Sequence, residues 1–159
     1  MQNVFYYDYP IGEVGIAEDG GAISHVIFRG DNKKNLKDFA VAETPLIKKT
    51  AAQLTEYFAG KRTEFDLPLV PSGTEFQRSA WQALLTIPYG KTRSYGEIAA
   101  QIGNPKACRA VGMANNRNPI AIIIPCHRVI GSNGSLVGYG GGLDVKRFLL
   151  DLENRCTFR

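Results

Sequence analysis

The stretch S-Y-G-E-I-A-A-Q-I-G-N-P-K-A-C-R-A-V-G-M-A, residues 94–114, decides the fold of the second half of the chain. Ser94 followed three residues later by Glu97 is a capping box, which predicts a short helix that ends at Gly103. Asn104 followed by proline is typical of an N-cap with proline at the first helical position, so a second helix is expected to begin there. Two helices joined by so tight a turn predict a helix-turn-helix.

The second of these helices consists mainly of small or compact residues, broken by one long cation, Arg109. These residues are Ala107, Cys108, Ala110, Val111, Gly112 and Ala114. Close packing against another helix explains such a surface, and it is the interpretation that the residues alone favour. The alternative is a helix pressed against a bulky partner such as a DNA groove, with Arg109 reaching inward.

Upstream of this motif, a capping box at Thr74 predicts a further helix that buries Leu84. The segment 68–73 is rich in proline and glycine, which indicates a linker. The sequence therefore predicts two domains, residues 1–72 and 73–159.

The N-terminal domain is predicted to be a small antiparallel sheet plus one helix. Apolar or alternating segments separated by Pro10 and by an Asp-Gly-Gly turn predict strands at residues 4–9, 12–17 and 22–28. An amphipathic pattern over 45–58 predicts the helix, which Gly60 ends. Its buried face is expected to hold Leu46, Ala51, Leu54 and Phe58.

Charge is distributed unevenly along the chain. Residues 1–74 carry 8 Lys and Arg against 10 Asp and Glu, whereas residues 75–159 carry 11 against 5, so the halves have net charges of −2 and +6. A basic half is typical of a surface that binds a polyanion, although an ordinary basic face gives the same count.

Other classes of protein are disfavoured by composition. No apolar run approaches the roughly 20 residues of a membrane helix, and the first ten residues do not resemble a secretion signal, so a cytoplasmic protein is expected. Three cysteines in no C-x-x-C pair argue against a disulfide scaffold. His25 and His127 are far apart without paired ligands, so we expect no metal and no cofactor.

The candidate reactive residue is Cys126, in P-C-H-R after the apolar run 120–124, which is predicted to be a buried strand. A cysteine in such a place is most often inert core, and His127 alone is most often a satisfied polar group. The functional alternative is a thiol whose proton His127 accepts, which raises the thiolate fraction. A glycine-rich loop with Tyr139 as an aromatic wall favours a pocket beside them.

Glu153 is predicted to lie in the last turn of a final helix that starts near Leu143 and buries Val145, Phe148 and Leu152. The helix dipole disfavours a carboxylate there, so Glu153 needs a compensating partner. Solvent is the simpler partner, and His127 is the functional alternative, which gives a relay of three residues.

Three motifs together resemble the O6-alkylguanine-DNA alkyltransferases: N-P-K-A-C-R-A-V-G at 104–112, P-C-H-R-V-I at 125–130 and G-Y-G-G-G-L at 138–143. The match covers about residues 74–154. The resemblance implies an RNase H-like α/β domain followed by a mostly helical winged-helix domain. It implies repair of O6-alkylguanine in double-stranded DNA, bound through the minor groove, by a monomer without an obligatory protein partner.

The resemblance also implies roles for individual residues. Cys126 attacks the alkyl carbon, His127 takes the thiol proton through a water, and Glu153 orients His127. Asn118 holds the turn behind the cysteine, and Tyr95 gives a hydrogen bond or a proton to the departing base. The carbonyls of Cys126 and Val129 recognise the amino group of that base, and Tyr139 forms a wall of the pocket.

On the DNA side, the resemblance implies that Arg109 enters the base stack in place of the extruded base, with its small-residue helix in the groove. Phosphate or backbone contacts are expected at Tyr95, Gly96, Asn104, Ala107 and Ser132. Gly140 stands where many relatives have serine, so its backbone N–H is expected to serve there, and the zinc cluster of some relatives is missing. The rival hypotheses are a winged-helix protein that recognises damage without repairing it, and an unrelated thiol hydrolase.

Overall fold

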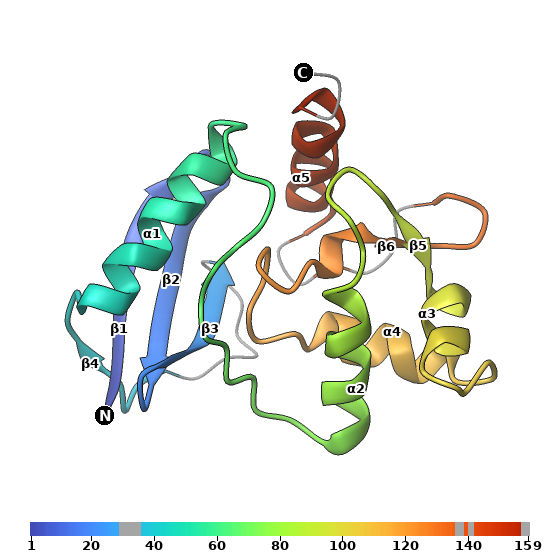
Figure 1. Cartoon of the computed structure of the whole chain (residues 1–159), viewed down its shortest axis with the longest axis horizontal. Coiled ribbons are helices and arrows are strands. Elements are labelled where there is room, and N and C mark those ends of the chain that lie inside the picture. The colour runs from blue at the N-terminus through green and yellow to red at the C-terminus, as the bar shows by residue number, and fades with distance from the viewer. Residues whose placement is uncertain (29–35, 136–138, 140–141, 157–159) are drawn as a thin grey trace.

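The computed structural model describes residues 1–28, 36–135, 139 and 142–156 of the chain, with a sheet and one helix on one side and a group of short helices on the other (Figure 1). The elements in chain order are β1 (Gln2–Tyr9), β2 (Gly12–Asp19), β3 (Ala22–Phe28), β4 (Ala40–Val41), α1 (Pro45–Phe58), α2 (Glu75–Leu84), β5 (Arg93–Ser94), α3 (Tyr95–Gln101), α4 (Cys108–Asn116), η1 (Cys126–Arg128), β6 (Val129–Ile130) and α5 (Leu143–Cys156).

The N-terminal sheet has the strand order β3-β2-β1-β4, and the three predicted strands are present in antiparallel register. The predicted antiparallel strands are confirmed, but a fourth strand was not predicted: β4 pairs with β1 in parallel, through Asn3 with Ala40 and Val4 with Val41, which makes the sheet mixed. Two exposed residues carry no alternation of apolar and polar side chains, so β4 left no signal in the sequence.

Helix α1 spans the predicted residues and packs on this sheet. Thr44 is its N-cap, and the Thr44 side chain accepts a hydrogen bond from the backbone N–H of Ile47. The buried face is rotated from the expected one, because Leu46 and Phe58 are half-buried while polar residues take part in the face. The buried residues are Ile47, Thr50, Ala51, Gln53, Leu54 and Tyr57. Tyr57, in the last turn, is fully buried and faces the C-terminal half.

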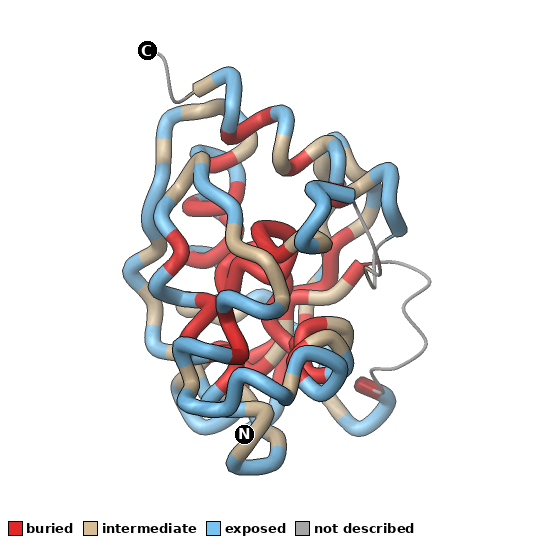
Figure 2. The backbone as a smooth tube through the Cα atoms, turned by 90° about the vertical axis from the view of Figure 1, so that its right-hand side faces the viewer, coloured by how far each residue is buried: buried red, intermediate tan, exposed pale blue. Residues whose placement is uncertain are grey.

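The edge strand β3 joins the two halves through main-chain hydrogen bonds. Ile23 donates to Pro68 at 2.8 Å and accepts from Val70 at 2.8 Å, so the linker forms a bridge along part of the strand. Val26 donates to Pro119 at 2.9 Å and accepts from Ala121 at 3.0 Å. The edge is thereby covered, and one continuous region of buried residues runs through both halves (Figure 2).

Both predicted capping boxes are present, at the starts of α2 and α3, and Trp81 of α2 donates its indole N–H to Ala114 of α4 at 2.8 Å. The predicted start of the second helix was wrong. Asn104 accepts from the backbone of Ala107 at 2.9 Å in a turn, and α4 begins three residues beyond the proline, at Cys108, without a side-chain cap.

The run 120–124 is buried but is not a strand, contrary to the prediction. Ile124 donates to Ile120 at 3.0 Å in a tight turn, and Ile122 has the left-handed φ of 70°. Because Ile120 forms just an isolated bridge to Val26, burial in the core rather than sheet pairing explains the β-branched residues. Cys126 therefore lies at the start of the 3-10 turn η1 and not at a strand end.

In the described part of the chain, no helix is both long and apolar enough to cross a membrane.

Candidate active site and nucleic-acid interface

Cys126 is held in a buried turn by two asparagines, and 5% of its surface is exposed. Asn118 donates from Nδ2 to the carbonyl of Ile124 at 2.7 Å and accepts from the backbone of Ile120 at 2.9 Å, which fixes the loop before the cysteine. Asn115 of α4 donates to the carbonyl of Cys126 at 3.2 Å. The sequence had indicated Asn118 for this place but not Asn115.

Glu153 of α5 is 1% exposed and collects hydrogen bonds from three segments of the chain. Its Oε1 accepts from Arg128 Nε at 2.8 Å and from the backbone of Gly90 at 3.3 Å, and its Oε2 accepts from Arg128 Nη2 at 3.0 Å and from the Tyr57 hydroxyl at 2.6 Å. Burial alone raises the pKa of Glu153, but His127 and Arg128 hold it well below its usual range. Glu153 is therefore an ionised carboxylate at neutral pH.

His127 is fully buried, and its Nε2 lies 2.6 Å from Oε2 of Glu153. Because an ionised carboxylate accepts hydrogen bonds and does not donate them, Nε2 carries the hydrogen and Nδ1 carries the lone pair. Among the described residues, Nδ1 has no hydrogen-bond partner. The ring is therefore oriented with its basic nitrogen available, and the contact between Glu153 and His127 suggested by the sequence is present.

The electrostatic environment favours the neutral forms of both reactive groups. Burial lowers the pKa of His127, although the hydrogen bond to Glu153 opposes that shift. Burial raises the pKa of the Cys126 thiol, opposed by Asn118, Tyr139 and the charge of Lys146. A thiol that is protonated at rest must give its proton to a base when it attacks, and His127, the next residue in η1, has a basic nitrogen with no partner among the described residues. The chemistry suited to this site is general-base nucleophilic attack.

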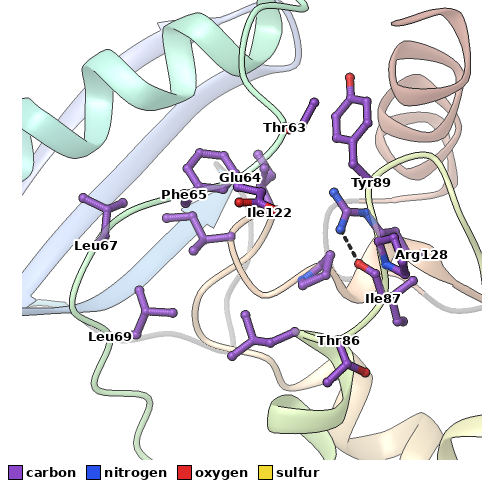
Figure 3. Close-up of a pocket in the computed structure, with 14 residues that line it drawn as sticks. Thr63, Glu64, Phe65, Leu67, Leu69, Thr86, Ile87, Tyr89, Ile122 and Arg128 are labelled. Carbon is purple, nitrogen blue, oxygen red and sulfur yellow. Dashed lines mark hydrogen bonds between the residues drawn. The ribbon is translucent and has the colours of Figure 1, made fainter. Parts of the chain in front are cut away.

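Arg128 separates this relay from a cavity of about 420 Å³ between the two halves (Figure 3). Its Nη1 donates to the carbonyl of Ile87 at 2.7 Å, and its guanidinium lies 5.6 Å from the centre of the Tyr89 ring. The described lining of this cavity does not include Cys126 or His127. Arg128 was not predicted as a site residue, although its place directly after the reactive pair was a usable signal.

The predicted pocket residues come together through β5 and β6. These strands pair in parallel, with Arg93 opposite Val129, so the start of α3 with Tyr95 lies beside buried Val129. Burial and then the nearby Cys126 raise the pKa of Tyr95, which stays protonated as a donor. The buried Tyr139 hydroxyl lies close enough to Cys126 for each to shift the pKa of the other. Gly140 lies outside the described residues.

The nucleic-acid candidates lie on the exposed side of α3 and α4. Arg109 is exposed and lines an open groove together with Tyr95, Lys106, Cys108, Gly112, Met113 and Asn116. Packing against α2 and α3 explains the small residues Val111 and Ala114, which are buried, but not Cys108 and Ala110, which are exposed.

The remaining predicted contacts, Gly96, Asn104 and Ser132, are exposed, and Ala107 is half-buried. Gly96 lies in the first turn of α3, and Asn104 lies in the turn between the two helices. All three cysteines are free thiols, and within the described ranges no three His, Cys, Asp or Glu side chains gather as a metal site would require.

Comparison with known proteins agrees with this geometry in both halves. Residues 5–71 match the family model described as the 6-O-methylguanine DNA methyltransferase ribonuclease-like domain, and residues 75–155 match the model of the DNA-binding domain of the same protein. The chain belongs to the 6-O-methylguanine DNA methyltransferase family. Its fold is the expected one, an N-terminal ribonuclease-like α/β domain, here with a mixed sheet, followed by a helical DNA-binding domain.

Members of the 6-O-methylguanine DNA methyltransferase family resemble this chain along nearly its whole length. A methylated-DNA–protein-cysteine methyltransferase of Methanosarcina acetivorans is 55% identical over 151 residues, which cover 94% of this chain and 97% of that protein. The protein of the same description from Mycobacterium leprae is 53% identical, over 92% and 88% of the two chains. The crystal structure of Mycobacterium tuberculosis OGT in complex with DNA superposes with a TM-score of 0.92 at 49% identity, covering 97% and 94%.

Proposed function

We propose that this chain repairs DNA by transferring the methyl group of O6-methylguanine to its own Cys126, as a methylated-DNA–protein-cysteine methyltransferase. The observation that carries this proposal is the buried relay in which Arg128 and Tyr57 hold Glu153, Glu153 orients His127, and His127 lies next to Cys126 in the turn η1. The relay occurs in a chain of the 6-O-methylguanine DNA methyltransferase family, whose members include a protein crystallised with DNA.

The reaction begins when Nδ1 of His127, acting through a water, accepts the proton of the Cys126 thiol. The sulfur then attacks the alkyl carbon, a carbon–sulfur bond forms, and the bond between carbon and O6 breaks with its electron pair going to the base. Tyr95 donates a proton or hydrogen bond to the departing guanine. The thiol proton is then on His127, and it returns through solvent to Tyr95 if Tyr95 gave its proton to the base, or otherwise to the base itself, so the overall reaction consumes none.

Glu153 contributes by stabilising the imidazolium that forms during this step. The proton gained at Nδ1 gives His127 a positive charge next to an ionised carboxylate that accepts its Nε2–H. Asn118 contributes by fixing the turn through its hydrogen bond to the Ile124 carbonyl, and its side chain also lowers the pKa of the Cys126 thiol.

The flipped base is recognised by main-chain groups and an aromatic wall. The carbonyls of Cys126 and Val129 accept hydrogen bonds from its amino group, and Tyr139 forms one wall of the pocket. The carbonyl of Cys126 already accepts from Asn115, but a carbonyl oxygen has two lone pairs, so one remains for the base.

The C-terminal domain binds DNA, and we propose that α4 enters the minor groove. Arg109 fills the space of the extruded guanine, and Gly96, Asn104, Ala107 and Ser132 contact the backbone. Outward-facing small side chains allow α4 to approach the groove closely, and the exposed guanidinium is free of the core. Extrusion costs a few kcal/mol, less for a poorly paired lesion, so damage is found without reading sequence.

A thioether has no evident route back to a thiol, so each molecule reacts once. We propose a monomer that works without metal, cofactor or protein partner. This stoichiometry also separates the proposal from a thiol hydrolase with the same three residues, which would turn over repeatedly and ignore DNA.

Intact-protein mass spectrometry after mixing with a duplex containing O6-methylguanine tests the proposal. One added methyl group is expected, located in the peptide that contains Cys126. The controls are Cys108→Ala, which removes the exposed thiol of the DNA groove, and Cys156→Ala; both should still gain one methyl group. Cys126→Ala should gain none while it keeps most of its affinity for DNA, which comes mainly from phosphate contacts. An unchanged mass in the natural protein would contradict the proposal and favour recognition without repair.

A further inference from the structure

Tyr57 brings the N-terminal domain into direct contact with the catalytic relay. It lies in the last turn of α1, is fully buried, and donates its hydroxyl hydrogen to Oε2 of Glu153 at 2.6 Å, across 96 positions of sequence. The acceptor is the same oxygen that receives the Nε2–H of His127 at 2.6 Å. One carboxylate oxygen thus connects a helix of the ribonuclease-like domain to His127, the general base next to Cys126.

Tyr57 stays un-ionised, so its hydroxyl remains a hydrogen-bond donor. Burial and then the charge of Glu153 raise the pKa of Tyr57 well above its ordinary value, so the hydroxyl keeps its hydrogen at neutral and acidic pH. A hydrogen bond to an ionised acceptor is about twice as strong as a neutral one, which fixes the carboxylate against rotation.

We infer that Tyr57 is a positioning residue for alkyl transfer, which holds the Glu153 carboxylate so that Oε2 meets Nε2 of His127. This inference rests on the function proposed above. Tyr57 contacts neither the thiol nor the base and acts through Glu153, so the ribonuclease-like domain takes part in the chemistry as well as in the fold.

Because Oε2 is shared, loss of the Tyr57 hydroxyl should change the pKa of His127. Three donors share Oε2, namely the Tyr57 hydroxyl, Nε2 of His127 and Nη2 of Arg128. Loss of the Tyr57 hydroxyl therefore leaves more of the negative charge of that oxygen for His127 and makes the imidazolium easier to form. The other ionisable groups that face Tyr57, Glu153 or His127 are Tyr89, Arg128, Tyr139 and Lys146, and Tyr57→Phe removes none of them.

The first test compares Tyr57→Phe with Tyr9→Phe in single-turnover transfer from O6-methylguanine duplex at several pH values. Tyr9 is the matched control, because its hydroxyl donates to Ala51 of the same helix at 2.8 Å and does not touch the relay. Tyr57→Phe should slow transfer about tenfold at the plateau of the profile, the effect of a partly misplaced group. The acid limb of its pH–rate profile, which is the range where the rate falls on acidification, should move to higher pH by about half a unit to one unit. Tyr9→Phe should keep the natural rate and limb, and both variants should keep the natural affinity for DNA.

A second variant keeps the test decisive if Tyr57→Phe folds poorly. Replacing Tyr57 with 3-fluorotyrosine preserves the ring and hydroxyl but makes the phenol a stronger donor. The acid limb should then move to lower pH, opposite to the shift in Tyr57→Phe, which a merely structural role would not produce.

The outcomes distinguish this inference from the proposed function. If the natural protein transfers methyl groups and both Tyr57 variants keep its rate and acid limb, Tyr57 only packs, and the inference is wrong. Equal changes in Tyr57→Phe and Tyr9→Phe would likewise indicate a general loss of stability. If the natural protein transfers nothing, the proposed function itself fails.

Discussion

Arg128 and Glu153 form a two-pronged ion pair in the interior of the protein, with Nε on Oε1 at 2.8 Å and Nη2 on Oε2 at 3.0 Å. The pair links the residue that follows the reactive dyad to the last turn of α5. A third nitrogen, Nη1, is bonded to the carbonyl of Ile87 at 2.7 Å, so the guanidinium also fixes the loop after α2 (Figure 3). Each partner therefore depends on the other for its burial.

Arg128→Met should destabilise the fold strongly, because it leaves the Glu153 charge buried with fewer donors. Breaking a buried pair from one side costs about 3–5 kcal/mol of unfolding free energy. Denaturant unfolding at neutral pH measures the loss. Arg62→Met is the control, since it breaks the more exposed pair with Glu56 and should cost at most about 1 kcal/mol. Similar losses in the two variants would show that the buried pair contributes little.

Glu153→Gln should slow alkyl transfer and raise the apparent pKa of Cys126 in a thiol-reactivity profile. The amide no longer stabilises the imidazolium, so His127 becomes a weaker base and supports less thiolate. Glu56→Gln, on the outer face of α1, controls for a changed surface charge and should leave the profile unaltered. A natural profile in Glu153→Gln would mean that no relay operates.

The acid limb of the transfer rate should lie below pH 6.5. Attack requires neutral His127, and burial lowers the pKa of that imidazole from 6.5, so the rate falls only when the pH drops through this lowered value. The free energy of unfolding should also fall as the pH drops below 6.5, because the unfolded chain then binds a proton at His127 that the folded chain does not. Single-turnover rates between pH 4.5 and 8 give the midpoint. A midpoint above 6.5 would contradict a neutral resting imidazole.

Arg109→Ala should impair repair of a lesion in duplex DNA far more than reaction with free O6-benzylguanine, which has no base stack to leave. The defect should persist at saturating protein, whereas the lost phosphate attraction should shrink as salt rises. Lys106→Ala is the matched control, because it removes a neighbouring cation of the same groove and should weaken binding without a flipping defect. Equal slowing on both substrates would place Arg109 in the support of the pocket.

Local signals predicted the elements whose cause is local. The capping boxes at Thr74 and Ser94 and the periodicity of α1 give helices at the expected places, because side chains three or four positions apart determine them. The prediction of a strand at 120–124 was wrong for the opposite reason. Its β-branched residues suit a strand, but the chain turns at Ile122 to bring Cys126 over α4, and tertiary packing decides that turn.

The site was predictable where it is contiguous or matches a family motif, and not where distant segments meet. Cys126 and His127 are neighbours. The helix dipole left solvent and His127 open as partners of Glu153, and the family resemblance favoured His127, which Glu153 contacts in the structure. Tyr57 gave no such signal. A tyrosine in an amphipathic helix is ordinary core, and its bond to Glu153 depends on how the two domains pack. Asn115 was missed because its amide reaches Cys126 from a separate helix.

The burial of Cys126 affects how long an unused molecule lasts in the cell. A protein that is consumed by its own reaction must survive intact until a lesion arrives, and bulk oxidants and other thiols reach a sulfur largely through its exposed surface. Cys126 presents 5% of its surface and a thiol that stays protonated at rest, whereas Cys108 is exposed. The burial that keeps the Cys126 thiol protonated therefore also protects it from oxidants and other thiols before it reacts.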